Sequence, residues 1–189
     1  MHLELLSASS LAAERDELAT LLCECVNAGG SLNFLAPMPR SDAIAYWSSV
    51  LPELESGDRI LVVARDGHRI VGSAQLAFTS KPNGRHRAEV NKVMVLPSHR
   101  RRGIAAQLMN ELERHARGRA IRLLVLDTAE GQSGAQAFYE SLGYTYVGGI
   151  PDYALDPHGV PVKNAIYFKS LESHRSIPAR NPRLGREGD

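Results

Sequence analysis

Apolar residues recur along this chain with two kinds of spacing, and each kind predicts a different element. Alternating or continuous apolar runs indicate β-strands, whereas apolar residues three and four positions apart indicate amphipathic helices. Strands are predicted over residues 2–6, 59–65, 68–80, 88–96, 120–128, 144–151 and 164–171. Helices are predicted over residues 9–28, over 43–56, from Gly103 onward, and over 131–142.

Short polar signals mark the boundaries of these elements. Ser9 is placed to cap the first helix, and Ser41 with Asp42 is placed to cap the second. Pro52 lies inside the second helix and is expected to bend or shorten it, because proline removes an intrahelical hydrogen bond. Asp66-Gly67 is a strong tight-turn signal, so the strands on either side are predicted to form a hairpin.

The order of the elements predicts the fold class. They run strand, helix, helix, three strands, helix, strand, helix and two strands, with a loop over residues 152–163. This order is typical of an α/β (α+β) fold, a mixed sheet of about seven strands with helices on both faces. We expect one domain over residues 1–171. Residues 172–189 lack apolar periodicity, so a flexible tail is expected there.

Composition and charge narrow the functional classes. The chain has 22 basic and 21 acidic side chains, a net charge of +1, which argues against a general binder of nucleic acid or membranes. The N-terminus lacks the pattern of a signal peptide, and no apolar run reaches the roughly 18 residues of a membrane span. We therefore expect a soluble, cytoplasmic protein with no nucleic-acid or membrane partner.

Cysteine and histidine give no sign of a metal site. Cys23 and Cys25 are two positions apart on a predicted helix and point to different faces, so neither a zinc site nor a disulfide is predicted. The seven histidines show no ligand spacing, and no metal is expected.

The stretch VMVLPSHRRRGIAAQLM, residues 93–109, joins a strand to a helix through four consecutive basic residues. Basic side chains oppose the positive end of the helix dipole, so a negative ligand would stabilise them. Backbone N–H groups at a helix N-terminus bind phosphates, and Gly103 would let a ligand approach closely. The motif R-x-x-G-x-A, Arg100 to Ala105, differs from both common nucleotide-binding loops. Two alternatives stay open: a solvated basic turn, and a nucleic-acid patch, which here lacks interleaved aromatics.

Two motifs together resemble the GNAT superfamily of acetyl-CoA-dependent N-acetyltransferases. One is the R-x-x-G-x-A turn between strand and helix, and the other is A-x-x-F-Y-x-x-x-G-Y in AQAFYESLGY, residues 135–144. The resemblance extends over residues 3–171 and implies that the parallel strands 89–96 and 121–127 splay apart to hold acetyl-CoA. Further stretches, among them KPNG, RAEV and KVMVLPS, are similar to members of this family that confer resistance to an amino-acid toxin.

The resemblance also implies which residues contact the coenzyme. The pantetheine arm would pair with backbone groups of Val93 and Val95 like an added strand, and the pyrophosphate would bind the N–H groups of residues 101–106. A backbone N–H near Val95 would stabilise the negative oxygen that develops during attack. Families of this type often carry asparagine where Gln132 stands here. The implied cofactor-binding residues are Val93, Met94, Val95, Arg100, Arg101, Arg102, Gly103, Ile104, Ala105, Ala106 and Gln132.

Acetyl transfer to an amine needs a base, because an ammonium has no lone pair, and it benefits from an acid for the departing thiolate. Glu89 and Asp127 are the candidate bases, and since they lie toward opposite ends of neighbouring parallel strands, a water relay is expected. Tyr139 is the candidate acid, because a phenol stays protonated at neutral pH. Each also has a structural interpretation: Glu89 could pair with Arg87 or Lys92, Asp127 could cap a turn, and Tyr139 could be a core aromatic.

The favoured function is direct transfer of an acetyl group from acetyl-CoA to the primary amine of a small molecule, such as a β-lactam amino-acid toxin or antibiotic. Acetylation of proteins or peptides is one alternative, and a sensor that binds acyl-CoA without turnover is another. Trp47 either lines the acceptor pocket or packs in the core. The oligomeric state stays open between monomer and homodimer.

Overall fold

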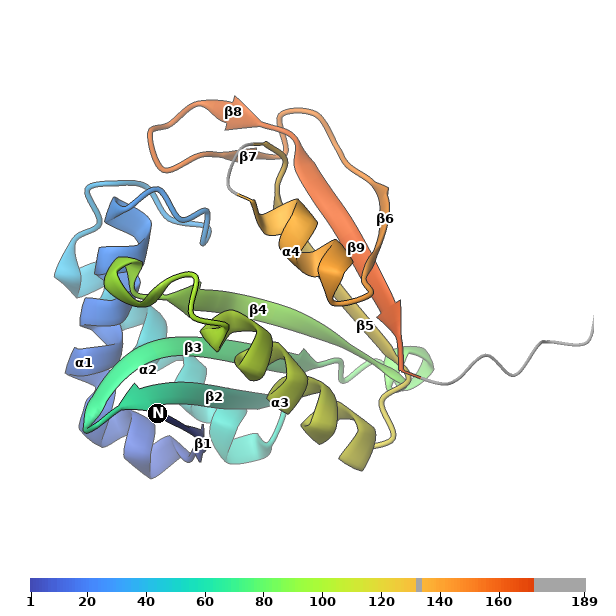
Figure 1. Ribbon diagram of the computed structural model, residues 1–189. Helices are drawn as coiled ribbons and strands as arrows, with labels where there is room; N and C mark the ends of the chain where they lie inside the picture. Colours follow the sequence, from blue (N-terminus) through green and yellow to red (C-terminus); the bar gives the residue numbers. More distant parts are fainter. Residues whose placement is uncertain (132–133, 172–189) are drawn as a thin grey trace, which may run out of the picture.

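A seven-stranded mixed sheet forms the centre of the molecule, with strand order β1-β2-β3-β4-β5-β9-β6 (Figure 1). The computed structural model describes residues 1–131 and 134–171, so Gln132 and the expected tail lie outside the described residues. The sheet strands are β1 (His2–Leu6), β2 (Arg59–Asp66), β3 (Arg69–Phe78), β4 (Arg87–Val95), β5 (Leu123–Ala129), β6 (Thr145–Gly148) and β9 (Asn164–Ser170). The helices are α1 (Ala8–Asn27), α2 (Arg40–Ser56), α3 (Ile104–Gly118) and α4 (Ala135–Ser141). The predicted fold class is confirmed.

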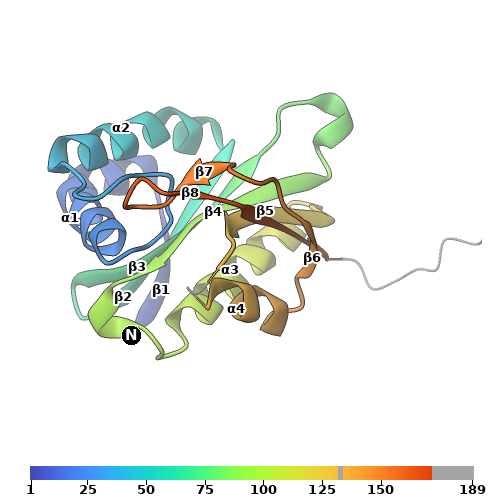
Figure 2. The same cartoon turned by 90° about the horizontal axis from the view of Figure 1, so that it is seen from above.

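Helices cover both faces of the sheet, with α1 and α2 on one side and α3 and α4 on the other (Figure 2). The apolar stripe along α3, formed by Ile104, Leu108, Leu112 and Ala116, is buried against β2, β3 and β4. On α2, Trp47 is completely buried and its ring meets the Tyr46 ring edge-on, so its role is packing. No helix of the described part is long and apolar enough to cross a bilayer.

Two predicted helix starts are wrong. The first helix is capped by Ser7, whose hydroxyl oxygen accepts a hydrogen bond from the Ser10 N–H at 3.1 Å, and Ser9 lies inside the first turn. The second helix begins at Arg40 after Pro39, so Ser41 and Asp42 also lie inside a first turn rather than before it. Proline has a backbone geometry suited to a helix boundary. Pro39 therefore marks the start of the second helix, ahead of both Ser41 and Asp42.

Pro52 does not shorten α2, contrary to one of the two expectations. The helix continues to Ser56 and ends at Gly57, which adopts the left-handed conformation. Burial of Ala43, Trp47 and Val50 on the preceding turns stabilises the helix enough to tolerate the one backbone bond that proline removes.

The stretch expected to be a loop contains a small hairpin of β7 (Ala154–Leu155) and β8 (Pro161–Val162). The Asp156 carboxylate organises its turn by accepting hydrogen bonds from the N–H groups of His158 and Val160 at 2.8 and 2.9 Å. The Ala36 N–H donates to the Pro157 carbonyl at 2.7 Å. This bond ties the hairpin to the segment between α1 and α2.

A buried ion pair joins α3 to β9, two elements that lie on opposite sides of the β4–β5 junction. Lys169 Nζ donates to Glu113 Oε1 at 2.6 Å and to the Leu142 carbonyl at 2.7 Å. The Glu113 side chain is only 5% exposed, and its remaining partner is Arg117 at 3.3 Å. Because β4 and β5 share few hydrogen bonds, contacts of this kind hold the two parts of the sheet together.

We predict that Lys169→Met lowers the free energy of unfolding by about 3 kcal/mol, because it leaves a buried carboxylate without its main partner. Urea unfolding of the variant and the wild type measures this difference. The double variant Glu113→Leu/Lys169→Met should recover much of the loss, since it buries no unpaired charge. Equal destabilisation of the single and double variants would show that packing, not charge, is responsible.

Candidate active site

A cleft of about 490 Å³ opens where β4 and β5 separate. Its walls come from the end of α1 and the segment after it, β4, the turn before α3, the end of β5 and the start of α4. Its lining residues are Cys25, Ala28–Asn33, Val90–Val95, Arg100, Arg101, Ala105, Asp127, Thr128, Gly134, Ala135, Phe138 and Tyr139. Residues from distant parts of the chain therefore lie together at the gap between β4 and β5.

The opening follows from the pairing of the two parallel strands. β4 and β5 pair only between Arg87–Glu89 and Leu123–Val125, and they diverge beyond that point (Figure 1). In the diverging part of β4, Lys92 and Val93 lie opposite the single residue Ala74 of β3, which is a β-bulge. Lys92 adopts a positive φ of 50° there. Since a bulge bends its strand, the extra residue directs β4 away from β5.

One end of the cleft meets the N-terminus of α3. Gly103 precedes this helix with φ 76°, a left-handed conformation that favours glycine, and the first helical turn contains no acidic residue. A Cβ built on Gly103 would meet only Gln107 Nε2, at 4.0 Å, so the space above the helix terminus is open. Backbone N–H groups, which have no partner within a helix's first turn, are thus accessible to an anion here.

The basic residues before α3 differ in their surroundings. Arg101 lines the cleft, with φ 61°. Arg100 also lines it, but its Nε donates to the Val95 carbonyl at 3.3 Å, and the Cys25 thiol reaches the same oxygen at 3.5 Å. Arg102 is exposed. The Val95 carbonyl is therefore already engaged by side chains of this chain.

The carboxylates of Glu89 and Asp127 lie on one face of the sheet. Glu89 pairs with Val125, and Asp127 follows Val125 by two residues, which keeps it on the same side. Asp127 Oδ2 accepts a long hydrogen bond from Asn164 Nδ2 at 3.5 Å. Within residues 1–131 and 134–171 the Glu89 carboxylate has no ion pair, so the alternative in which it pairs with Arg87 or Lys92 is not observed. Both side chains are exposed and able to accept a proton.

Tyr139 of α4 lines the cleft from the other side and is nearly buried, with 9% of its surface exposed. Its ring packs near those of Phe138, Tyr144 and Tyr167, with centroids 5.1 to 6.0 Å away. Burial raises the pKa of Tyr139, and the nearby negative charge of Asp127 raises it further. The phenol therefore keeps its proton throughout the physiological range, as a proton donor must.

Lys92 is one of the two residues of the bulge, and it too lines the cleft. Its ammonium lies over the Tyr46 ring at 5.2 Å and over the Phe34 ring at 5.4 Å from the centroids. Burial and the neighbouring Arg59 lower the pKa of Lys92 from 10.5 to about 8, although Asp127 and Glu89 act in the opposite direction. At neutral pH the group is thus a protonated but poorly solvated cation.

The structure brings many of the predicted site residues to this cleft. Those on its lining are Val93, Met94, Val95, Arg100, Arg101, Ala105, Asp127 and Tyr139. Others adjoin it: Glu89 lies one residue before the lining part of β4, and Arg102, Gly103, Ile104 and Ala106 surround the start of α3. The Ile104 and Met94 side chains are buried in the core, so these residues offer mainly backbone groups. Gln132 is not among the described residues.

Sequence reasoning missed two parts of the site. The segment Ala28–Asn33 lines the cleft opposite β4, yet its sequence indicates only the end of a helix. The sequence indicates Lys92 only as a possible partner of Glu89, because lysine has no preference for the left-handed conformation that the bulge imposes. The one available signal was the polar pair Asn91-Lys92 in an otherwise valine-rich strand.

The profile of the Acetyltransferase (GNAT) family matches residues 30–144, more than half of the chain, and the chain belongs to this family. Over 111 residues it is 37% identical to an uncharacterised N-acetyltransferase in the hisH–hisA intergenic region of Azospirillum brasilense, an alignment that covers 58% of this chain and 64% of that one. The chain spans 39% to 64% of the length of the curated relatives it matches.

Solved structures share the fold at low sequence identity. A ribosomal-protein-alanine N-acetyltransferase from Brucella melitensis superimposes with a TM-score of 0.72 and 19% identity over 90% of this chain and 99% of that one. YncA from Salmonella typhimurium, solved with its cofactor acetyl-CoA, gives a TM-score of 0.73 and 17% identity over 95% of this chain and 98% of that one.

We predict that the free energy of unfolding of Lys92→Met decreases, relative to that of the wild type, as the pH rises. In the folded wild type the pKa of Lys92 is about 8, whereas its ordinary value is 10.5. Between these two pH values the unfolded chain binds more protons than the folded protein does, so the free energy of unfolding of the wild type rises with pH. The variant has no such gain. Between pH 7 and pH 10, the ratio of the two unfolding constants should change by about tenfold or more. Chemical denaturation at both pH values tests this, and a constant ratio would contradict the lowered pKa.

Proposed function

We propose that this protein is an N-acetyltransferase that moves the acetyl group of acetyl-CoA to the primary amine of a small molecule. One observation carries the proposal. A single cleft has an unobstructed helix N-terminus with adjacent arginines at one end, an unpaired strand edge along its length, and a proton-bearing phenol beside a carboxylate. These are the parts that binding a phosphorylated coenzyme and transferring its acyl group require.

The residues present fit the coenzyme. The N–H groups at the start of α3, after Gly103, would hold the pyrophosphate, with Arg101 and Arg102 supplying positive charge. Beyond Glu89 the β5-facing edge of β4 has no strand partner in the described part, so Val93 and Val95 could pair with an extended pantetheine arm. Arg100 would have to release the Val95 carbonyl if that group took part. When bound, acetyl-CoA supplies an acetyl thioester open to attack by an amine.

Side chains of this protein would accept and donate the protons during acetyl transfer. Glu89 and Asp127 form no ion pair with any described residue and face the same side of the sheet, so either could take the amine proton, directly or through water. Tyr139 holds its proton at neutral pH and would donate it to the departing thiolate. No cysteine is needed as a nucleophile, and burial raises the pKa of Cys25 to about 11, which keeps that thiol protonated.

The acceptor is proposed to be small and amino-acid-like. KPNG, RAEV, KVMVLPS, LDT and AFYESLGYTYVG are similar to the tabtoxin-resistance acetyltransferase, which detoxifies a β-lactam amino acid. A role in toxin or antibiotic resistance, in the cytoplasm, is therefore the leading prediction. Acetylation of a protein or peptide is the second candidate, and coenzyme sensing without turnover is the third; retention of Glu89, Asp127 and Tyr139 together favours turnover.

Two substitutions of Gly103 that are nearly equal in size test whether the N-terminus of α3 binds the pyrophosphate. Asparagine and aspartate both tolerate left-handed backbone, so they share the strain and differ in charge. We expect Gly103→Asp to weaken acetyl-CoA binding at least about tenfold more than Gly103→Asn does, because it places a carboxylate at the pyrophosphate position. Isothermal titration calorimetry with acetyl-CoA measures both. Equal affinities would place the pyrophosphate elsewhere, and no binding by the wild type would overturn the proposed function.

The acid role is tested by Tyr139→Phe, which removes one hydroxyl that has no hydrogen bond among the described residues. We expect kcat to fall about 100-fold with the KM for acetyl-CoA little changed. Thiol release with small amines, β-lactam amino acids first, provides the assay. Tyr144→Phe is the matched control, since Tyr144 is a buried neighbour that does not line the cleft and whose hydroxyl likewise has no hydrogen-bond partner in the described part of the chain. Similar losses in both variants would assign the effect to packing.

A further inference from the structure

The bulge in β4 positions Lys92 against aromatic rings rather than in solvent. Its ammonium lies 5.2 and 5.4 Å from the ring centroids of Tyr46 and Phe34, which meet each other edge-on at 5.5 Å. Aromatic faces attract a cation but leave its three N–H donors without acceptors. The bulge thus holds a positive charge at a defined point on the cleft lining.

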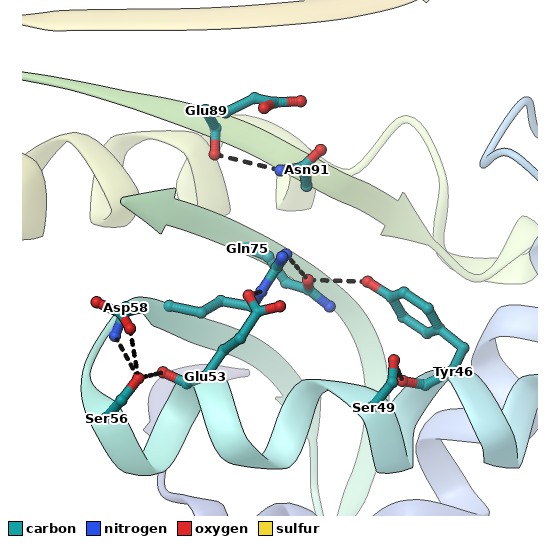
Figure 3. Close-up of polar contacts among 9 residues, drawn as sticks. Tyr46, Ser49, Glu53, Ser56, Asp58, Gln75, Glu89 and Asn91 are labelled. Carbon is teal, nitrogen blue, oxygen red and sulfur yellow. Dashed lines mark hydrogen bonds and ion pairs between the residues drawn. The ribbon is translucent and has the colours of Figure 1, made fainter. Parts of the chain in front are cut away.

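A hydrogen-bonded chain fixes the aromatic side of this compartment. The Tyr46 hydroxyl donates to Gln75 Oε1 at 2.9 Å, and Arg59 Nη1 donates to the same oxygen at 2.7 Å. Arg59 Nε in turn pairs with Glu53 at 2.7 Å. Figure 3 shows this arrangement, with Tyr46, Gln75 and Glu53 below β4 and with Glu89 and Asn91 on that strand. Arg59 is therefore occupied, and the Tyr46 ring is held in place under Lys92.

Lys92 itself is uncommitted. Within residues 1–131 and 134–171, no carboxylate forms an ion pair with it and no group accepts a hydrogen bond from it. Two other lysines of the described residues do have carboxylate partners: Lys163 pairs with Glu130 at 3.1 Å, and Lys169 pairs with Glu113 at 2.6 Å. A half-buried cation without an anion is unfavourable, so Lys92 favours a ligand that brings a negative charge.

The same compartment also carries negative charge. Glu89 and Asp127 lie on the sheet face that Asn91 and Gln75 share, and both influence the proton affinity of Lys92 without forming an ion pair with it. A ligand lying between them would meet a cation on one side and two carboxylates on the other. Charge complementarity of this kind matches a molecule with an amine and a carboxylate a few bonds apart.

We infer that Lys92 binds the carboxylate of the acceptor, so that the enzyme selects amino acids over amines that lack a carboxylate. The inference rests on the proposed N-acetyltransferase function and adds to it the residue that recognises the carboxylate of an amino-acid acceptor. The amine of such an acceptor lies toward Glu89 and Asp127, where its proton can leave, while Lys92 and the Phe34–Tyr46 pair hold the other end. Arg59 contributes positive charge from behind Tyr46 but is already bound to Glu53 and Gln75.

The test compares L-α-amino acids with their matching carboxamides as acceptors, by thiol release from acetyl-CoA. The quantity measured is the ratio of kcat/KM for each acid to that for its amide, so intrinsic differences between the two amines cancel when variants are compared. For Lys92→Met we expect this ratio to fall about 10- to 100-fold, as for loss of a hydrogen bond to a charged group. The fall should come from KM for the acids, with kcat for the amides unchanged.

Two further variants separate charge from structure. Lys92→Arg keeps the charge and should restore most of the preference for acids. Lys163→Met removes a lysine that is already paired with Glu130 and should leave the ratio unchanged. A parallel loss with acids and amides in Lys92→Met would reveal a structural role and overturn the inference, as would an unchanged ratio.

Failure of the inference and failure of the proposed function are distinguishable. A wild type that acetylates acids and amides equally retains the proposed function and loses the inference. A wild type that binds acetyl-CoA but transfers to neither set overturns both the small-amine function and the inference. Absence of acetyl-CoA binding in calorimetry overturns the proposed function itself.

Discussion

The early end of pairing between β4 and β5 is the constraint on which the rest of the molecule depends. Three residue pairs join these parallel strands, and beyond Glu89 and Val125 each strand presents backbone groups to the other across a gap. Unpaired backbone donors and acceptors are costly when buried, so the gap must stay open to water or be filled by a ligand. The bulge at Lys92, the left-handed Gly103 and the cleft between them are arranged around this opening.

An opening of this kind weakens the sheet, and other contacts restore the connection between its two parts. Lys169 joins β9 to α3 through Glu113, and the Ala36 N–H joins the segment after α1 to the β7–β8 hairpin. The molecule thus keeps a stable framework while leaving a local interruption where chemistry can take place.

Much of the fold could be predicted because its strands and helices differ clearly in apolar spacing, as in α3 with Leu108 and Leu112 on one side. The basic turn before Gly103 was also recognisable, because its charges oppose the helix dipole. The bulge could not be predicted, since it depends on the register between β3 and β4 and Lys92 carries no local signal for it. The hairpin over 152–163 was missed because its strands have two residues each and contain no apolar alternation.

The contact between Arg100 and the Val95 carbonyl has a consequence for self-association. A sheet interrupted in its middle has inner edges as well as outer ones, and any exposed edge can recruit a strand from another chain. Along β4 the Arg100 guanidinium and the Cys25 thiol cover one inner acceptor, and β6, one of the two outer strands, is only four residues long. A side-chain cover on this acceptor shortens the stretch of inner edge with which a strand of a second chain could pair.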